Sequence, residues 1–220
     1  MHLLHTVYEP EGDGPHPTIV ALHGWGANAM DLLGLAPYFA EGQFLVLCPQ
    51  GRVEVPIDPM VGYGWFPLTM GAPPDAAAFT AGVEDARQFI DAAVRRYPVD
   101  ANKLIVLGFS QGGVIAYALA LSEPERFAGL VALSSWLPAQ VMEALPPRSY
   151  DRLTTLIHHG SRDDLIEAAR GRESVERLRS LRVPVTYREF DMGHEINAES
   201  LGDLSTWLHD RIVSPIVLAR

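Results

Sequence analysis

Short runs of β-forming residues alternate with amphipathic helical patterns along most of this 220-residue chain. Apolar or β-branched residues dominate the runs at 18–22, 44–48, 103–107, 129–133, 154–158 and 184–190. Apolar residues recur with the helical period over 83–96, 167–181 and 199–212. Strands that alternate with helices pair mainly in parallel and are covered by helices on both faces, so an α/β fold is predicted. Ligands of such folds bind at the carboxyl ends of the strands, where functional residues are therefore expected.

Length and composition limit the classes of partner. With 48% hydrophobic residues the chain can bury one sizeable core, so a single domain over residues 1–220 is expected. A formal net charge of −10 repels phosphate backbones, which argues against a nucleic-acid partner. Neither a secretory signal pattern nor the roughly 20 apolar residues of a membrane span is found, so we expect a cytoplasmic protein without a membrane span. The single cysteine, Cys48, lies in an apolar run and is expected to be an inert core residue.

The pentapeptide Gly108-Phe109-Ser110-Gln111-Gly112 joins a β-rich run to a pattern typical of a buried helix. Glycines on both sides of a serine let the chain turn sharply from a strand into a helix, which holds the hydroxyl above the edge of the sheet. G-x-S-x-G also occurs by chance in glycine-rich loops, but the flanking strand and helix favour the catalytic interpretation. Ser110 is therefore the candidate nucleophile of a serine hydrolase.

A serine hydroxyl is a poor nucleophile at neutral pH and needs a histidine base. His194 is the best candidate after Ser110, because it lies in a loop just beyond the last β-rich run, from which an imidazole can reach over the serine. His158 and His159 end another β-rich run, where structural hydrogen bonding is the favoured role. His209 lies within a helical pattern and is expected to be solvated.

The histidine in turn needs a carboxylate that orients it and stabilises its charge. Asp163 and Asp164 both follow the run 154–158 in a turn, and spacing alone does not separate them. Asp151 precedes its strand and Asp191 belongs to the loop that carries the histidine, so both rank lower.

The developing negative charge on the substrate oxygen needs two preorganised donors, usually backbone N–H groups. In the hydrolase topology one comes from the residue after the serine, here Gln111, and one from an early loop between a strand and a helix. The glycines of His23-Gly24-Trp25-Gly26 suit such a loop, which makes the Trp25 N–H the second candidate donor. Core packing of Trp25 is the alternative interpretation.

The segment 52–80 is rich in proline and glycine and is predicted to be neither a regular helix nor a central strand. Loops of this length in compact domains are usually functional. Its apolar side chains must either cover the core or line a cleft. We favour a hydrophobic wall beside the nucleophile, with Trp65 and Phe66 against the acyl group of a substrate and not in the core.

Four segments together resemble the carboxylesterase and acyl-protein thioesterase family of α/β-hydrolases, in order along most of the chain. They are residues 23–26, 108–113, 159–163 and 193–195. The resemblance implies an α/β-hydrolase fold with about seven strands and hydrolysis of carboxylic esters or thioesters without a cofactor or metal. It also implies that Ser110 is the nucleophile, His194 the base and Asp163 the acid, and so it selects Asp163 over Asp164.

The resemblance extends to the expected substrate pocket. Residues 64–66 are similar to an aromatic pair of the family, and residues 133–138, with Trp136 and Leu137, resemble its pocket-lining segment. Ser135 stands where many relatives have glycine, which affects the shape of the pocket. After the acid, residues 164–166 replace the proline and valine that are frequent in the family, a change expected to affect loop stiffness more than chemistry.

The leading hypothesis is a serine carboxylesterase that acts on small to medium acyl esters through an acyl-enzyme, as a monomer or homodimer. Acyl-protein thioesterase or lysophospholipase activity is the alternative within the family. The fold also permits peptidase or lactonase activity, although nothing in the chain supplies a propeller domain. A non-catalytic binding protein would normally have lost one of the three catalytic residues. A metal-dependent hydrolase is disfavoured because no H-E-x-x-H or paired-cysteine spacing exists.

Overall fold

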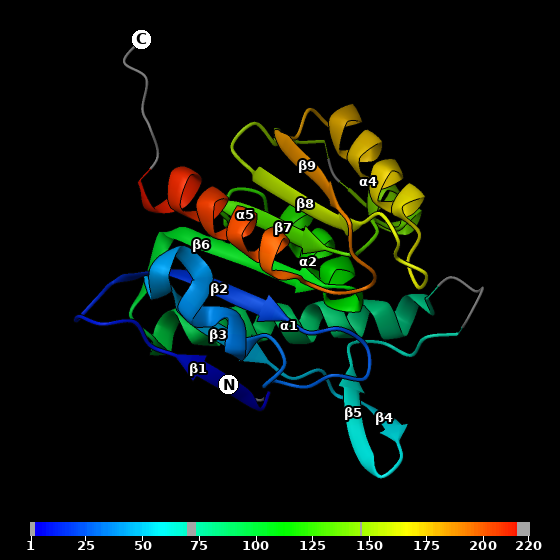
Figure 1. The fold of residues 1–220 in the computed structure, drawn as a ribbon, viewed down its shortest axis with the longest axis horizontal. Helices are drawn as coiled ribbons and strands as arrows, with labels where there is room; N and C mark the ends of the chain where they lie inside the picture. Colours follow the sequence, from blue (N-terminus) through cyan, green and yellow to red (C-terminus); the bar gives the residue numbers. More distant parts are fainter. Residues whose placement is uncertain (1–2, 70–73, 146, 215–220) are drawn as a thin grey trace.

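A seven-stranded sheet with helices on both faces forms the centre of the protein (Figure 1). The computed structural model describes residues 3–69, 74–145 and 147–214. The strand order is β1-β3-β2-β6-β7-β8-β9, and β1 pairs antiparallel with β3 while the remaining pairs are parallel. The predicted α/β fold with a mainly parallel sheet is thus confirmed. The strands are β1 (His5–Tyr8), β2 (His16–Leu22), β3 (Leu45–Pro49), β6 (Val99–Phe109), β7 (Gly129–Leu133), β8 (Thr154–Gly160) and β9 (Val185–Phe190).

Each face of the sheet packs against its own set of helices. One core cluster includes side chains of α1 (Ala76–Arg96), α2 (Gln111–Ser122) and α4 (Ala168–Ser180), and α3 (Ala139–Glu143) contributes Val141 to it. The other cluster includes side chains of η1 (Leu33–Gly42), α5 (Ala198–Leu208) and the π-helical turn η2 (His209–Val213). In the described parts of the chain, no helix combines the length and apolar character needed to cross a membrane.

The continuous apolar runs of the central strands follow from this layering. In β3, Leu45 and Leu47 belong to the first cluster, whereas Val46 and Cys48 belong to the second. Successive side chains of a strand point to opposite faces, so a strand covered on both faces is apolar at every position. Burial raises the pKa of the Cys48 thiol to about 12, which agrees with the expectation of an inert core residue.

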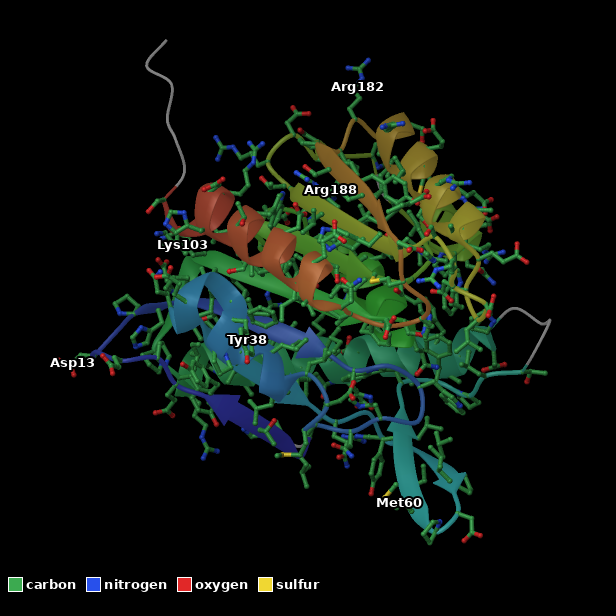
Figure 2. All side chains as sticks on the ribbon, in the orientation of Figure 1. Asp13, Tyr38, Met60, Lys103, Arg182 and Arg188 are labelled. Carbon is green, nitrogen blue, oxygen red and sulfur yellow. The ribbon has the colours of Figure 1, made fainter. Side chains whose placement is uncertain are left out.

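The segment 52–80 contains regular structure that its prolines had concealed. The strands β4 (Val53–Ile57) and β5 (Met60–Gly64) form a separate hairpin that projects from the body of the molecule (Figure 1). Met60 lies near its tip and is 69% exposed (Figure 2). A two-stranded ribbon tolerates the missing N–H of a proline because it has no central strand. Residues 70–73 of the segment lie outside the described residues.

Some element boundaries differ from the predicted ones. Helix α1 begins at Ala76, well before position 83, because the Asp75 side chain caps it by accepting a hydrogen bond from the Ala78 N–H (2.8 Å). Its first turns are largely exposed, so they lack the apolar period from which a helix is predicted. Strand β1 and helix η1 were not predicted.

A pair of glycines in two helices tests how closely α2 packs. A Cβ atom on Gly112 of α2 would lie 2.0 Å from the Leu22 carbonyl oxygen, whereas one on Gly202 of α5 would meet nothing within 4 Å. We expect Gly112→Ala to lower the free energy of unfolding by roughly 1 to 3 kcal/mol through overpacking. Gly202→Ala should raise it by about 0.5 to 1 kcal/mol, because alanine is the better helix former. Urea unfolding curves measure both, and equal midpoints would contradict the close approach of α2 to β2.

Candidate active site

The predicted site residues lie beyond the carboxyl ends of four strands. Ser110 follows β6, the loop 23–27 follows β2, Asp163 follows β8, and His194 follows β9. From β2 the chain proceeds to β3 on one side and later returns to β6 on the other. The carboxyl ends of β2 and β6 therefore flank a topological switch point, the usual place of a ligand site in an open α/β sheet.

Ser110 sits in a strained turn between β6 and α2. Its φ of 51° and ψ of −118° are unusual for a residue with a side chain. The turn is tight, because a Cβ atom on Gly108 would lie 2.2 Å from the Gly112 carbonyl oxygen. Position 108 therefore requires glycine for steric reasons. Position 112 does too, because a Cβ atom there would lie 2.0 Å from the Leu22 carbonyl oxygen. Strain of this kind persists only where the surrounding structure enforces it, and it concentrates at functional sites.

Ser135 stabilises the same turn. Its hydroxyl donates a hydrogen bond of 2.7 Å to the Ser110 carbonyl oxygen, which also accepts from the Gly113 N–H at 3.0 Å. The Ser135 side chain is completely buried. From the sequence, Ser135 was noted only as a position where many relatives have glycine. In the structure its side chain holds the backbone of the candidate nucleophile.

His194 and Asp163 form a hydrogen-bonded pair. His194 Nδ1 lies 2.8 Å from Asp163 Oδ2, and a carboxylate only accepts, so Nδ1 carries the proton. The other oxygen, Oδ1, accepts hydrogen bonds from the backbone N–H groups of Leu165 (3.0 Å) and Ile166 (2.8 Å). Asp163 is 6% exposed, whereas Asp164 lies on the surface. The structure therefore separates the two acids that spacing left equal.

The imidazole of His194 packs against the ring of Phe109, the residue before Ser110. The two ring centroids are 4.9 Å apart, and Phe109 directly precedes Ser110. Within the described ranges, Ser110 Oγ and His194 share no hydrogen bond. Catalytic hydrogen bonds are often long in unliganded sites and tighten only when a substrate binds.

The remaining histidines beyond Ser110 have partners of their own, although His159 Nε2 also lies 3.5 Å from Asp163 Oδ2. His158 Nε2 lies 2.9 Å from Asp203 Oδ2, and His159 Nε2 lies 2.7 Å from the Ile166 carbonyl oxygen. Both imidazoles are buried, in agreement with the structural role expected for them. His209 is exposed, also as expected. The two lower-ranked acids, Asp151 and Asp191, lie on the surface.

The loop 23–27 passes directly beside the serine. A Cβ atom on Gly24 would lie 3.4 Å from Ser110 Cβ. The hairpin holds this loop, because the Gly26 N–H donates to the Tyr63 carbonyl oxygen (2.9 Å) and the Tyr63 N–H donates to the Ala27 carbonyl oxygen (2.7 Å).

His23, which begins this loop, has no role assigned from the sequence. Its Nδ1 donates to the Gly24 carbonyl oxygen (2.7 Å), and its Nε2 accepts from the Gly51 N–H (3.0 Å). These two bonds require the neutral imidazole, and burial lowers the pKa of His23 to about 4. Burial likewise lowers the pKa of His158 to about 4, against the opposing effect of Asp203.

Trp65 and Phe66 lie in the core, so the expectation that they face an acyl group instead of the core was wrong. They are 3% and 0% exposed and belong to the first core cluster. The hairpin returns the chain to the body of the protein just before them, where the Trp65 ring packs against His23 and the Phe66 ring against Phe79. Trp136 is half-buried and Leu137 is buried, and contact of these two with substrate stays a prediction.

Comparisons with known proteins agree with this architecture. A sequence model described as phospholipase/carboxylesterase matches residues 4–212. The chain is 25% identical over 205 residues to acyl-protein thioesterase 1 of Gibberella zeae, covering 86% of this chain and 85% of the relative. A probable carboxylesterase of Oryza sativa subsp. japonica is 27% identical over 157 residues, covering 67% of this chain and 58% of the relative's length. The crystal structure of the Bacillus cereus carboxylesterase superposes with a TM-score of 0.82 at 21% identity, covering 96% of this chain and 95% of that one.

The lowered pKa values of His23 and His158 predict that both stay neutral well below pH 6.5. In histidine-selective ¹⁵N NMR, we expect their ring nitrogens to titrate near pH 4. Between about pH 4 and 6.5 the unfolded chain then binds more protons than the native protein, so stability falls as the pH is lowered through this window. Each histidine contributes a slope of at most about 1.4 kcal/mol per pH unit. Titration of either ring near pH 6.5 would contradict its burial.

Proposed function

Because this chain belongs to the phospholipase/carboxylesterase family, we propose that it hydrolyses carboxylic esters of small to medium acyl groups through an acyl-enzyme on Ser110. The hydrogen bond between His194 and Asp163, beside the strained turn of Ser110, is the observation that carries this proposal. In the proposed mechanism His194 is the general base and Asp163 the acid that orients it.

The proton of the His194 imidazole determines the direction of transfer. Nδ1 donates to Asp163 Oδ2, which leaves Nε2 unprotonated and free to accept the Ser110 hydroxyl proton. As that proton leaves, Oγ attacks the ester carbonyl carbon and forms a tetrahedral intermediate. The imidazolium then protonates the departing alkoxide, and the C–O bond breaks to give the acyl-enzyme. A water molecule, with His194 again as the base, then attacks the carbonyl carbon of the acyl-enzyme. The bond to Ser110 Oγ breaks, His194 returns the proton to Oγ, and the carboxylic acid is released.

The oxyanion of the intermediate would be bound by the backbone N–H groups of Trp25 and Gln111. In the described parts of the chain, neither group donates a hydrogen bond to a protein acceptor. Gln111 N is one of the free donors at the start of α2, where the helix dipole also favours negative charge. The loop 23–27 lies beside Ser110, as a second donor requires. Two such donors stabilise the transition state more than the substrate.

Thioester hydrolysis is the second candidate, because one relative is named an acyl-protein thioesterase. Its attack and oxyanion steps are the same, and only the leaving group differs. Hydrolysis of p-nitrophenyl esters and acyl thioesters of matched chain length compares the two.

Removal of the nucleophile or the base tests the mechanism. We expect Ser110→Ala and His194→Ala each to lower kcat by roughly 10³-fold or more, because the residues act as a unit. A fluorophosphonate probe should label Ser110 in the wild type and leave Ser110→Ala unlabelled. Circular dichroism controls for folding, and chelators should leave the activity unchanged. Retained turnover in a folded variant would refute the proposed mechanism.

The neighbouring acids provide a matched pair of variants. Asp163→Asn should lower kcat by about 10³ to 10⁴-fold, because an amide permits the wrong tautomer of His194. Asp164→Asn changes an exposed neighbour and should have little effect. Ester hydrolysis under saturating substrate measures both, and the reverse ranking would show that Asp163 is not the acid.

A further inference from the structure

The two proposed oxyanion donors come from different strands, yet both of their segments contact the same three residues, 64–66. Trp25 belongs to the loop after β2, and Gln111 begins the helix after β6. No hydrogen bond in the described ranges joins Trp25 directly to Gln111. Gly64 ends the hairpin, Trp65 and Phe66 follow it, and these three residues connect to both sides.

Trp65 makes one buried hydrogen bond to each side. Its indole Nε1–H donates to the His23 carbonyl oxygen at 2.9 Å, and its backbone N–H donates to Gln111 Oε1 at 2.8 Å. The Gln111 amide completes the contact, because Nε2 donates to the Phe66 carbonyl oxygen at 2.7 Å. Gln111 and Phe66 are fully buried, and hydrogen bonds in such surroundings are costly to break. The same residue thus holds the start of the oxyanion loop and the side chain of the second donor.

Gly64 brings the two sides into contact. A Cβ atom on this glycine would lie 2.3 Å from Trp25 Cε3 and 3.0 Å from Gln111 Oε1. The Trp25 ring therefore rests on the backbone of Gly64, next to the Gln111 amide. Any side chain at position 64 would push the ring away.

We propose that Trp65 is a positioning residue that sets the separation of the Trp25 and Gln111 N–H groups, an inference that rests on the proposed function. Oxyanion donors act only within about 2.7–3.1 Å of the developing charge. A displacement of 1 Å can reduce the rate about 10²-fold. The two donors follow different strands, so their separation depends on a residue that contacts both segments. Trp65 is that residue, because it is hydrogen-bonded to His23 and to Gln111. Trp65 acts on the reaction through His23, bonded to its indole ring, and through Gln111, bonded to its backbone N–H, and not through contact with an acyl chain.

The test replaces the indole N–H while keeping an aromatic ring. In Trp65→Phe the bond to the His23 carbonyl is lost, whereas the backbone bond to Gln111 is kept. Active sites are first counted by fluorophosphonate titration, so that unfolded protein does not enter kcat. We expect kcat per titrated site to fall about 10 to 100-fold with little change in KM, by the same factor for acetyl and octanoyl esters.

The Ki of an inhibitor that mimics the oxyanion provides a second measurement. This Ki would not change if Trp65 only stabilised the fold. An alkyl trifluoromethyl ketone adds to the serine and places its oxygen where the oxyanion would form. Its Ki should rise by the same factor as kcat falls. Phe89→Leu is the matched control, because Phe89 is a fully buried aromatic of the same core cluster without a side-chain hydrogen bond. This variant should lose stability but keep kcat and Ki per titrated site.

Two further variants keep the inference testable if Trp65→Phe does not fold. Benzothienylalanine at position 65 replaces the indole N–H by sulfur in a ring of nearly the same size, and should give the same loss of kcat. Gly64→Ala should displace Trp25 and also raise Ki, whereas Gly202→Ala should leave it unchanged.

The outcomes separate the inference from the proposed function. Wild-type kcat and Ki in the Trp65 variants would overturn the inference and leave the function intact. A loss confined to octanoyl esters would also overturn it, in favour of an acyl-binding wall. A wild-type protein that neither reacts with the probe nor hydrolyses esters would overturn the proposed function, and the inference with it.

Discussion

The close approach of helix α2 to strands β2 and β6 is the constraint on which the rest of the site depends. A Cβ atom on Gly112 would meet the Leu22 carbonyl oxygen at 2.0 Å, and one on Gly108 would meet the Gly112 carbonyl oxygen at 2.2 Å. Such contacts leave the backbone no room to relax at Ser110. Its positive φ costs conformational energy that the surrounding packing offsets. The position of the serine is therefore a property of the backbone.

Buried polar side chains next to this turn are held by backbone groups of the loops. Asp163 accepts two backbone N–H groups, His23 bonds to the backbone on both ring nitrogens, and the Gln111 amide bonds to two consecutive backbone positions. Loop backbone lacks partners in a sheet ladder, so its N–H and C=O groups are available to side chains. Each of these side chains thereby orders a loop that secondary structure does not order.

The chemistry is divided between two sides of the sheet, the side of β2 and β6 and the side of β8 and β9. The loop after β2 and the turn after β6 supply the candidate donors and the nucleophile, while the acid and base follow β8 and β9 at the other end of the sheet. The hairpin β4–β5 belongs to the first side, through its hydrogen bonds to the loop 23–27. The hairpin supports the site without lining it, because Trp65 and Phe66, which directly follow it, are buried.

Local patterns in the sequence were enough to predict six of the seven strands of the sheet, most helices and the positions of Ser110, Asp163 and His194 relative to strands, since each depends on residues close together in the chain. The choice between Asp163 and Asp164 needed either a resemblance or the fold, because burial of a carboxylate is a tertiary property. The burial of Trp65 and Phe66 was predicted wrongly, because an aromatic residue suits a core and a cleft equally well. Only the tertiary structure decided that Trp65 bonds to both His23 and Gln111, because these residues meet through the packing of separate strands and no periodicity records such a contact.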